Sequence, residues 1–261
     1  MLKRVMANRE FLITLVYKDL KGRYIGSAMG IFWNVLNPLI IILVYTFVFS
    51  YVMKTKLPAS AGTDKFVLFL FCGMIPWTGF AESITRSTTV ISDNSNLVKK
   101  FRFPPEILVV YIVISSFIHQ LIALFFLIVL LAAWGHPLGG YALFLPIVFI
   151  FNLSLNTGLS FFLASANVFI RDVSHILGAL MLVLFFATPI VYPLEFVPLK
   201  IRVLMSFNPL VQLVEIYRDL LLRNQFHSII GVAYFVTVSI VILFLGKIIF
   251  VKTSDSFADI I

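Results

Sequence analysis

Residues 107–134, ILVVYIVISSFIHQLIALFFLIVLLAAW, decide the fold of this chain, because they form an apolar run without Asp, Glu, Lys or Arg. An uncharged apolar run of roughly 18 residues or more is typical of a helix that crosses a bilayer. Working outward from it, comparable apolar stretches occur at residues 31–53, 66–90, 141–168, 175–194 and 228–250. The pattern predicts an all-α integral membrane protein with six transmembrane helices.

The composition agrees with this class of protein. Of the 261 residues, 61% are apolar and only 12% are charged, and the mean hydropathy is +1.04, whereas a soluble domain carries about 25% charged residues. Six spans of ~20 residues use about half of the chain, so we expect residues 1–261 to form a single transmembrane domain. The single cysteine, Cys72, excludes an intramolecular disulfide.

The basic residues set the expected orientation. The net charge of +8 does not indicate nucleic-acid binding, because the basic residues gather at the ends of the spans. With a cytoplasmic N-terminus, twelve of the twenty Lys and Arg residues lie inside, seven lie outside and Arg86 lies within a span. Since cytoplasmic loops carry the excess of positive charge, we expect both termini to be cytoplasmic.

Residues 1–24 have the pattern of an amphipathic helix. Charges run through the segment, so it has no continuous apolar core and does not resemble a signal peptide. One face is apolar at helical spacing and the cations lie elsewhere, which suits a helix at a lipid surface or a helix packed beside the spans. The apolar face contains Ile13, Val16, Tyr17, Leu20 and Tyr24, and the cations are Lys18, Lys21 and Arg23.

Polar residues within the predicted spans indicate contacts between helices. Glu82 and Arg86 are four residues apart, so they can pair toward a protein interior or a water-filled cavity. We interpret them as a structural pair rather than as a transport site. Two polar or kinked stripes, Asn34, Asn37 and Pro38 in the first span and Asn152, Asn156 and Ser160 in the fourth, favour helix packing.

Residues 195–227 are too apolar for an aqueous loop and too charged to span. Asn208 is a plausible N-cap and Pro209 suits the first helical position. The sequence predicts a pair of helices, around residues 197–207 and from residue 209, that are re-entrant or interfacial before the last span. A plain interfacial hairpin without functional duty is the alternative to a role in gating. The apolar face of the second helix contains Leu210, Leu213, Val214, Tyr217 and Leu221.

Residues 94–106, NSNLVKKFRFPPE, indicate a docking surface on the inner side. Charged and aromatic side chains are presented together before a rigid Pro104–Pro105 pair, as at protein interfaces. Ordinary positive-inside anchoring would explain the lysines but not the aromatics and prolines. The turn 169–173 is a second inner element, in which Arg171 and Asp172 can pair locally or contact a partner.

Four ordered segments resemble the permease subunit of type-two ABC exporters, and most of all the Wzm-type permeases for O-antigen, capsule and teichoic-acid chains. Residues 105–106, Pro-Glu, depart from a pattern in which many relatives have a basic or other residue before the glutamate. The resemblance covers nearly the whole chain. Its segments are GSAMGIFWNVLNPLIIILVYTFVF (26–49), NLVKKFRFPPEIL (96–108), NVFIRDVSHI (167–176) and TPIVYPLEFVPLKIRVLMSFNPLVQLVEIYRDLLL (188–222).

The resemblance implies a homodimeric permease in the bacterial cytoplasmic membrane that works with two copies of a separate ATPase and moves a lipid-linked polysaccharide outward. It implies an inner interface helix at 1–24, a coupling helix within 94–106 and a re-entrant segment at 195–227. The implied ATPase-coupling residues are Leu97, Lys99, Lys100, Arg102, Phe103, Pro104, Glu106, Arg171 and Asp172. For a lipid-linked substrate with an anionic headgroup we expect access at the cations Lys18, Lys21 and Arg23, and a channel or exit at the aromatics Tyr192, Phe196 and Tyr217. The alternative is that these cations anchor the helix to anionic lipid and that these aromatics form an interfacial belt.

The motifs that the sequence lacks distinguish three possible functions: an exporter subunit, a secondary transporter and a membrane-embedded enzyme. No GxxxxGK[ST] motif, which binds the phosphates of ATP, occurs in the sequence. We therefore expect this chain to have no catalytic residue and to bind no cofactor or metal. ATP and Mg are expected on the partner ATPase. A secondary transporter usually needs ion-coupling groups and internal repeats; Glu82 and His119 are present without an evident repeat. A membrane-embedded enzyme of lipid-linked sugars needs clustered acids, but Asp64, Asp93 and Asp172 stand apart in the sequence. The exporter subunit fits best.

Overall fold

The computed structural model describes residues 7–22, 33–100, 103–136 and 138–261. Within these ranges the chain is helical and contains no strand. Among the described residues, four helices are long and apolar enough to cross a membrane: α4 (Phe66–Asp93), α6 (Glu106–Ala133), α7 (Leu145–Phe169) with the short η4 (Gly140–Phe144) before it, and α11 (Ile229–Thr253). The predicted all-α membrane class is confirmed, and each predicted span coincides with a helix; a count of six crossings stays a prediction.

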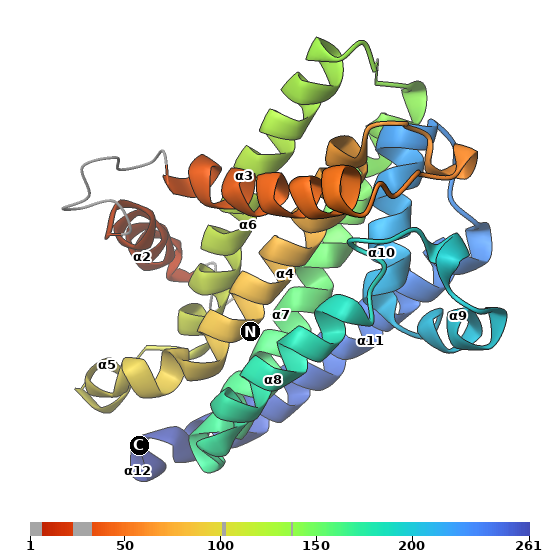
Figure 1. The fold of residues 1–261 in the computed structure, drawn as a ribbon. Helices are drawn as coiled ribbons and strands as arrows, with labels where there is room; N and C mark the ends of the chain where they lie inside the picture. The colour runs from red at the N-terminus through yellow and green to blue at the C-terminus, as the bar shows by residue number, and fades with distance from the viewer. Residues whose placement is uncertain (1–6, 23–32, 101–102, 137) are drawn as a thin grey trace.

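Helix α4 lies at the centre of the bundle (Figure 1). In its most apolar stretch 78% of the residues are buried within the protein, against 22% in α11, so the rest of the described chain leaves most of α11 uncovered. Pro76 lies inside α4 without ending it, as occurs in membrane helices whose neighbours satisfy the freed backbone groups.

Helices α7 and α11 pack backbone against backbone. A Cβ atom added at Gly246 would lie 2.0 Å from the carbonyl oxygen of Gly158, and one added at Gly158 would lie 2.5 Å from the carbonyl oxygen of Ile242. Small residues permit such close approach between membrane helices. The pair Gly158 and Gly246 therefore fixes how closely these helices pack.

The first predicted span, 31–53, coincides with α3 (Trp33–Thr46) and the π-helical η2 (Phe47–Val52). Figure 1 shows α3 running across the long helices rather than beside them. Leu43, Phe47 and Tyr51 are between 60% and 73% exposed. This element therefore keeps a broad apolar face that the rest of the chain does not cover.

The fifth predicted span, 175–194, is wrong at its C-terminal end. Helix α8 covers Asp172–Phe186 and then gives way to a turn. Pro189 cannot donate a backbone hydrogen bond, and the carbonyls of Pro189 and Ile190 accept hydrogen bonds from Arg218 instead of from a continuing helix. The side chain of Arg218 thus supplies the hydrogen-bond donors that a further helical turn would have supplied.

The two ends of the bundle carry the short elements (Figure 1). At one end lie α5 (Ser95–Lys100), the start of α8, η7 (Ser254–Ser256) and α12 (Phe257–Ile260), while α2 (Arg9–Gly22) packs on α6. Toward the other end lie η3 (Ala59–Ala61), α10 (Pro209–Arg218) and η6 (Asp219–Arg223), with η5 (Leu194–Phe196) and α9 (Leu199–Met205) preceding α10.

Helix α10 begins as the sequence predicts and is enclosed by protein. The side-chain oxygen of Asn208 accepts a hydrogen bond from the backbone N–H of Leu210 at 2.9 Å, and Pro209 occupies the first turn. The predicted apolar face is buried, but Glu215 and Arg218 on the polar side are buried as well. A helix covered by protein in this way suits the re-entrant alternative, and the depth of α10 in the membrane stays a prediction.

Candidate functional site

Helix α2 contacts the bundle through a face that overlaps the predicted apolar face only in part, since Val16 and Leu20 of that face are half-buried. Leu15 packs on a buried apolar cluster that includes Val109 and Val113 of α6, and the ring of Phe11 meets the ring of Phe103 edge-on at 5.5 Å. Ile13 and Tyr17, from the predicted apolar face, are each 63% exposed. One apolar stripe of α2 thus packs on protein, and the position of this helix at a lipid surface stays a prediction.

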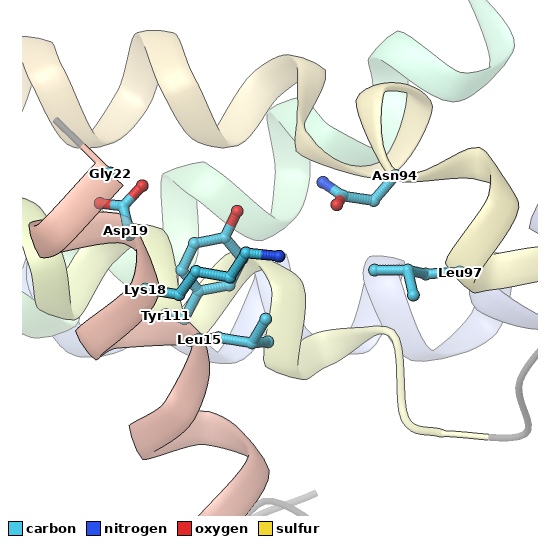
Figure 2. A pocket seen from close by; sticks show the side chains of 7 residues that line it. All are labelled: Leu15, Lys18, Asp19, Gly22, Asn94, Leu97 and Tyr111. Carbon is cyan, nitrogen blue, oxygen red and sulfur yellow. The ribbon is translucent and has the colours of Figure 1, made fainter. Parts of the chain in front are cut away.

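A pocket of about 370 Å³ lies where α2, the junction of α4 with α5, and α6 meet. In Figure 2 the ammonium group of Lys18 points toward Asn94, and the ring of Tyr111 lies beside the Lys18 side chain. The pocket brings together Lys18, a predicted substrate-access residue, and Leu97, a predicted coupling residue. Its lining consists of Leu15, Lys18, Asp19, Gly22, Asn94, Leu97 and Tyr111.

The other predicted access cations do not line this pocket. Lys21 is exposed, and its ammonium lies 5.8 Å from the centre of the Tyr17 ring on the outer side of α2. Arg23 and the apolar residue Tyr24 lie outside the described residues. Lys18 is therefore the access cation that the structure places beside the bundle.

An ion cluster ties α2 to the interior of the bundle. Arg86 donates to Glu82 at 3.4 Å, which confirms the predicted pair, and it also donates to Asp19 of α2. The ring of His119 lies 3.4 Å from the Glu82 carboxylate. The contributions of Asp19 and His119 were not predictable from spacing, because they come from two other helices.

The predicted coupling residues differ in accessibility. Lys99 is exposed on α5, whereas Leu97, Phe103 and Pro104 are half-buried. Glu106 is only 2% exposed, so its assignment as a surface contact is wrong. Its carboxylate stands in the first turn of α6, where a negative charge favours a helix. The side chain of Lys100 and the whole of Arg102 lie outside the described residues.

The second inner element lies at the same end of the molecule. Arg171 and Asp172 are exposed where α7 gives way to α8. A pocket of about 480 Å³ is lined by Arg171, by Ser95 of α5 and by Ile260 of α12. The structure thus places the two predicted coupling elements around one pocket.

The three predicted exit aromatics have different environments. Tyr217 is fully buried, and its hydroxyl accepts a hydrogen bond from the Gln120 amide at 3.1 Å. Its assignment as a ring that a passing polymer can touch is wrong, because helix packing encloses it. Tyr192 is half-buried and donates to the carbonyl of Phe186, while Phe196 is 55% exposed.

A chain of buried polar side chains crosses the core. The Gln120 carbonyl oxygen accepts from Asn152 at 3.4 Å, Asn156 donates to the Asn152 carbonyl oxygen at 2.8 Å, and Ser83 donates to Asn156 at 2.6 Å. These contacts link α4, α6 and α7, and Tyr217 adds α10. The interpretation of Asn152 and Asn156 as packing residues is confirmed.

A second buried network surrounds Arg218, which is 0% exposed. Arg218 donates to Glu215 at 2.8 Å, and Arg223 donates to Glu215 at 2.8 Å and to Asp219 at 2.9 Å. His227 lies 2.6 Å from Asp219. Sequence reasoning missed this network, although the spacing of three and four residues between these charges could have indicated it.

Within the described ranges no three His, Cys, Asp or Glu side chains lie close enough together to hold a metal ion. The geometry instead consists of a cation-bearing pocket next to α5, an ion cluster behind it and exposed elements at one end.

Comparison with known proteins identifies the family. The chain belongs to the ABC-2 type transporter family, whose family model matches residues 10–222. It is 32% identical to the O-antigen export system permease protein RfbA of Myxococcus xanthus, over 96% of this chain and 95% of that protein. It is 29% identical to a protein of the same name from Klebsiella pneumoniae, over 97% and 95%. It is 25% identical to the polysialic acid transport protein KpsM of Escherichia coli, over 89% of each. The protein is thus a multi-pass transporter permease of the bacterial inner membrane.

Proposed function

We propose that this chain is the transmembrane subunit of an ATP-driven exporter that moves a lipid-linked polysaccharide, of O-antigen, capsule or teichoic-acid type, across the cytoplasmic membrane. The observation that carries the proposal is the pocket in Figure 2, which joins a cation of α2 to the start of α5. The names of relatives that align over nearly their whole length support the substrate class.

The working assembly is a homodimer with two copies of a separate ABC ATPase, which binds ATP and Mg. Lys99 of α5, together with Lys100 and Arg102, and the turn at Arg171 and Asp172 form the docking surface. Exposed charge at Lys99 and Arg171 supports this role. Hot-spot contacts at such interfaces are enriched in Arg and aromatic residues.

The orientation follows from charge. Both termini are cytoplasmic and the α5 end faces the ATPase. At that level an anionic lipid headgroup meets Lys18, Lys21 and Arg23, each contributing about 1 kcal/mol of attraction near an anionic surface. At the other end Tyr192 and the exposed Phe196 are placed to stack on sugar rings as the polymer leaves.

Co-purification and transport test this function. The chain is expressed with the ABC ATPase of its host, and the complex is reconstituted in vesicles with a lipid-linked glycan. We expect a stable complex, ATP hydrolysis only when the ATPase is present, and ATP-dependent movement of the glycan. Robust hydrolysis by the permease alone, or transport driven by an ion gradient without ATP, would contradict the proposal.

A further inference from the structure

A pocket of about 490 Å³ lies where η3, η5 and η6 meet, among the short elements at the end of the bundle away from α5. A volume of roughly 300–1,000 Å³ is usual for a site that binds a small ligand. The polar side chains on its wall include Ser60, Glu195, Arg223 and Gln225. None of these four residues lines the α2 pocket or the pocket beside Arg171, so this is a separate site.

Arg223 offers the pocket a hydrogen-bond donor in a fixed orientation. Its Nε–H donates to the backbone carbonyl of Ser60, and its Nη1 donates to Glu215 at 2.8 Å and to Asp219 at 2.9 Å. A guanidinium carries five N–H donors, so the two on Nη2 are left, and they make no hydrogen bond to a described residue. The side chain keeps 13% of its exposure and lines the pocket. The buried network therefore orients the guanidinium and leaves Nη2 for a ligand.

Two acceptors lie on the same wall. One carboxylate oxygen of Glu195, Oε1, accepts from the hydroxyl of Ser60 at 2.8 Å, and the other, Oε2, accepts from no residue in the described ranges. Gln225 donates from Nε2 to Asp219 at 2.7 Å, which leaves its carbonyl oxygen as an acceptor. Glu195 and Gln225 are both exposed. Ser60 joins the donor to the acceptors, because its carbonyl contacts Arg223 and its hydroxyl contacts Glu195.

A close approach of two backbones forms this wall before any ligand binds. Gly62 has a φ of +76°, and a Cβ atom added there would lie 2.7 Å from Cγ of Arg223 and 2.9 Å from the carbonyl oxygen of Leu222. Glycine adopts such a conformation at no steric cost, so the segment after η3 can pack directly on η6. Polar groups that are already in place reduce the entropy lost on binding.

A sugar hydroxyl fits this wall because it both donates and accepts hydrogen bonds. Two neighbouring hydroxyls of a pyranose ring can accept from Nη2 of Arg223 and donate to the carboxylate of Glu195, whereas a simple anion is repelled by Glu195 and a simple cation by Arg223. We propose that this pocket binds one saccharide unit of the exported polymer, with Arg223 as the donor and Glu195 and Gln225 as acceptors. Phe196, which follows Glu195 in η5 and is 55% exposed, adds an aromatic ring beside the pocket. The inference rests on the proposed function for the identity of the polymer.

A purely structural role for these contacts predicts a different result. If Ser60 and Glu195 only hold η3 against η5, Glu195→Ala lowers the melting temperature and leaves sugar binding unchanged. If they form a binding site, Glu195→Ala weakens sugar binding, and so does Ala59→Phe, which fills the pocket from its exposed wall without removing a hydrogen-bonding side chain.

The experiment titrates the permease–ATPase complex in nanodiscs with oligosaccharides released by mild acid from the surface polysaccharide of the host, and follows binding by saturation-transfer NMR. Binding to the ATPase alone is measured in parallel and subtracted, and inorganic sulfate is the anion probe. We expect a dissociation constant on the order of 1 mM for the wild type, weak enough for a polymer to move on. Glu195→Ala should weaken binding about tenfold, as the loss of a charged hydrogen-bond acceptor does, and Ala59→Phe should abolish it. Asp64→Ala, at an exposed acid that does not line the pocket, is the matched control and should bind as the wild type does.

Each outcome either supports or overturns the inference. Weaker oligosaccharide binding in Glu195→Ala and Ala59→Phe, with Asp64→Ala unchanged, would support it. Wild-type binding in both pocket variants, no binding by the wild type at millimolar oligosaccharide, or sulfate binding that Glu195→Ala strengthens while sugar binding stays the same would overturn it. A thermal unfolding curve identifies any fold defect in Glu195→Ala, in which case Ala59→Phe decides the question.

The vesicle transport assay is a separate measurement. Oligosaccharide binding with the expected order of variants, but without ATP-dependent movement of the lipid-linked glycan, would count against the proposed function alone. ATP-dependent movement of the glycan, together with oligosaccharide binding that neither pocket variant changes, would count against this inference alone.

Discussion

The guanidinium carbon of Arg218 lies 3.6 Å from the centre of the Phe69 ring. This contact joins α10 to the central helix α4, and the same side chain donates to the carbonyls of Pro189 and Ile190 in the turn after α8. One buried cation thus holds three parts of the chain that are far apart in sequence. It also explains why α8 stops short of its predicted end.

Replacing Arg218 with Met should lower the free energy of unfolding by about 3–5 kcal/mol, the usual cost of removing one partner from a buried ion pair. Glu215 would keep only Arg223, and two buried carbonyls would lose their donors. Thermal unfolding in detergent measures the change. Adding Glu215→Gln should recover part of the loss, and Lys56→Met at an exposed site is the control. Equal stability of Arg218→Met and wild type would refute the structural role.

Glycine substitutions should separate a tight helix contact from an open one. Gly246→Ala places a methyl group 2.0 Å from the Gly158 carbonyl oxygen, and overpacking of this kind costs about 1–3 kcal/mol. Gly178→Ala in α8 meets nothing within 4 Å and should gain up to about 1 kcal/mol of helix propensity. Thermal unfolding of both variants is the measurement. A Gly246→Ala variant as stable as the wild type would show that α7 and α11 do not pack as described.

Charge reversal on α5 should weaken association with the ATPase. Lys99→Glu is expected to cost about 1–3 kcal/mol of binding free energy, the range for an interface residue that contributes strongly. Lys200→Glu, at an exposed site of α9, carries the same change in charge away from the α5 end. Affinity is measured by titrating purified ATPase against permease in nanodiscs. Identical affinities for the two variants would mean that α5 serves only as a topology anchor.

Cysteine labelling should report the orientation. Cysteine at Lys99 or Ser174 is expected to react only with reagent on the cytoplasmic side, and cysteine at Pro58 or Lys200 only with reagent outside. The native Cys72 is fully buried, so it should stay unlabelled in the folded protein and need not be removed. Labelling on reversed sides would overturn the proposed topology.

The sequence was sufficient for the helices and for local chemistry. Apolar runs located every long helix, the Asn208 cap followed from its position before Pro209, and the Glu82–Arg86 contact followed from helical spacing. These features depend on residues within a few positions of one another. Short-range sequence patterns are therefore enough to predict these features.

Features that depend on distant partners were not predictable. Lipid and protein interior both accept apolar side chains, so hydropathy did not show that Tyr217 would be enclosed or that Ile13 would be exposed. The early end of α8 depends on Arg218, twenty-eight or more residues away in sequence. In the same way, the pocket beside Lys18 exists only because α2 packs on α6.

The polar chain from Ser83 through Asn156, Asn152 and Gln120 to Tyr217 has a mechanical consequence. Apolar helix surfaces in lipid slide past one another at small cost, but each side chain here has its partner at one height on a different helix. A shift of one helical turn would leave several of these groups without partners in a dry interior. These hydrogen bonds therefore fix the relative heights of four helices, α4, α6, α7 and α10, which should move as one rigid block. Any rearrangement that opens a path for substrate must then take place around this block rather than between its helices.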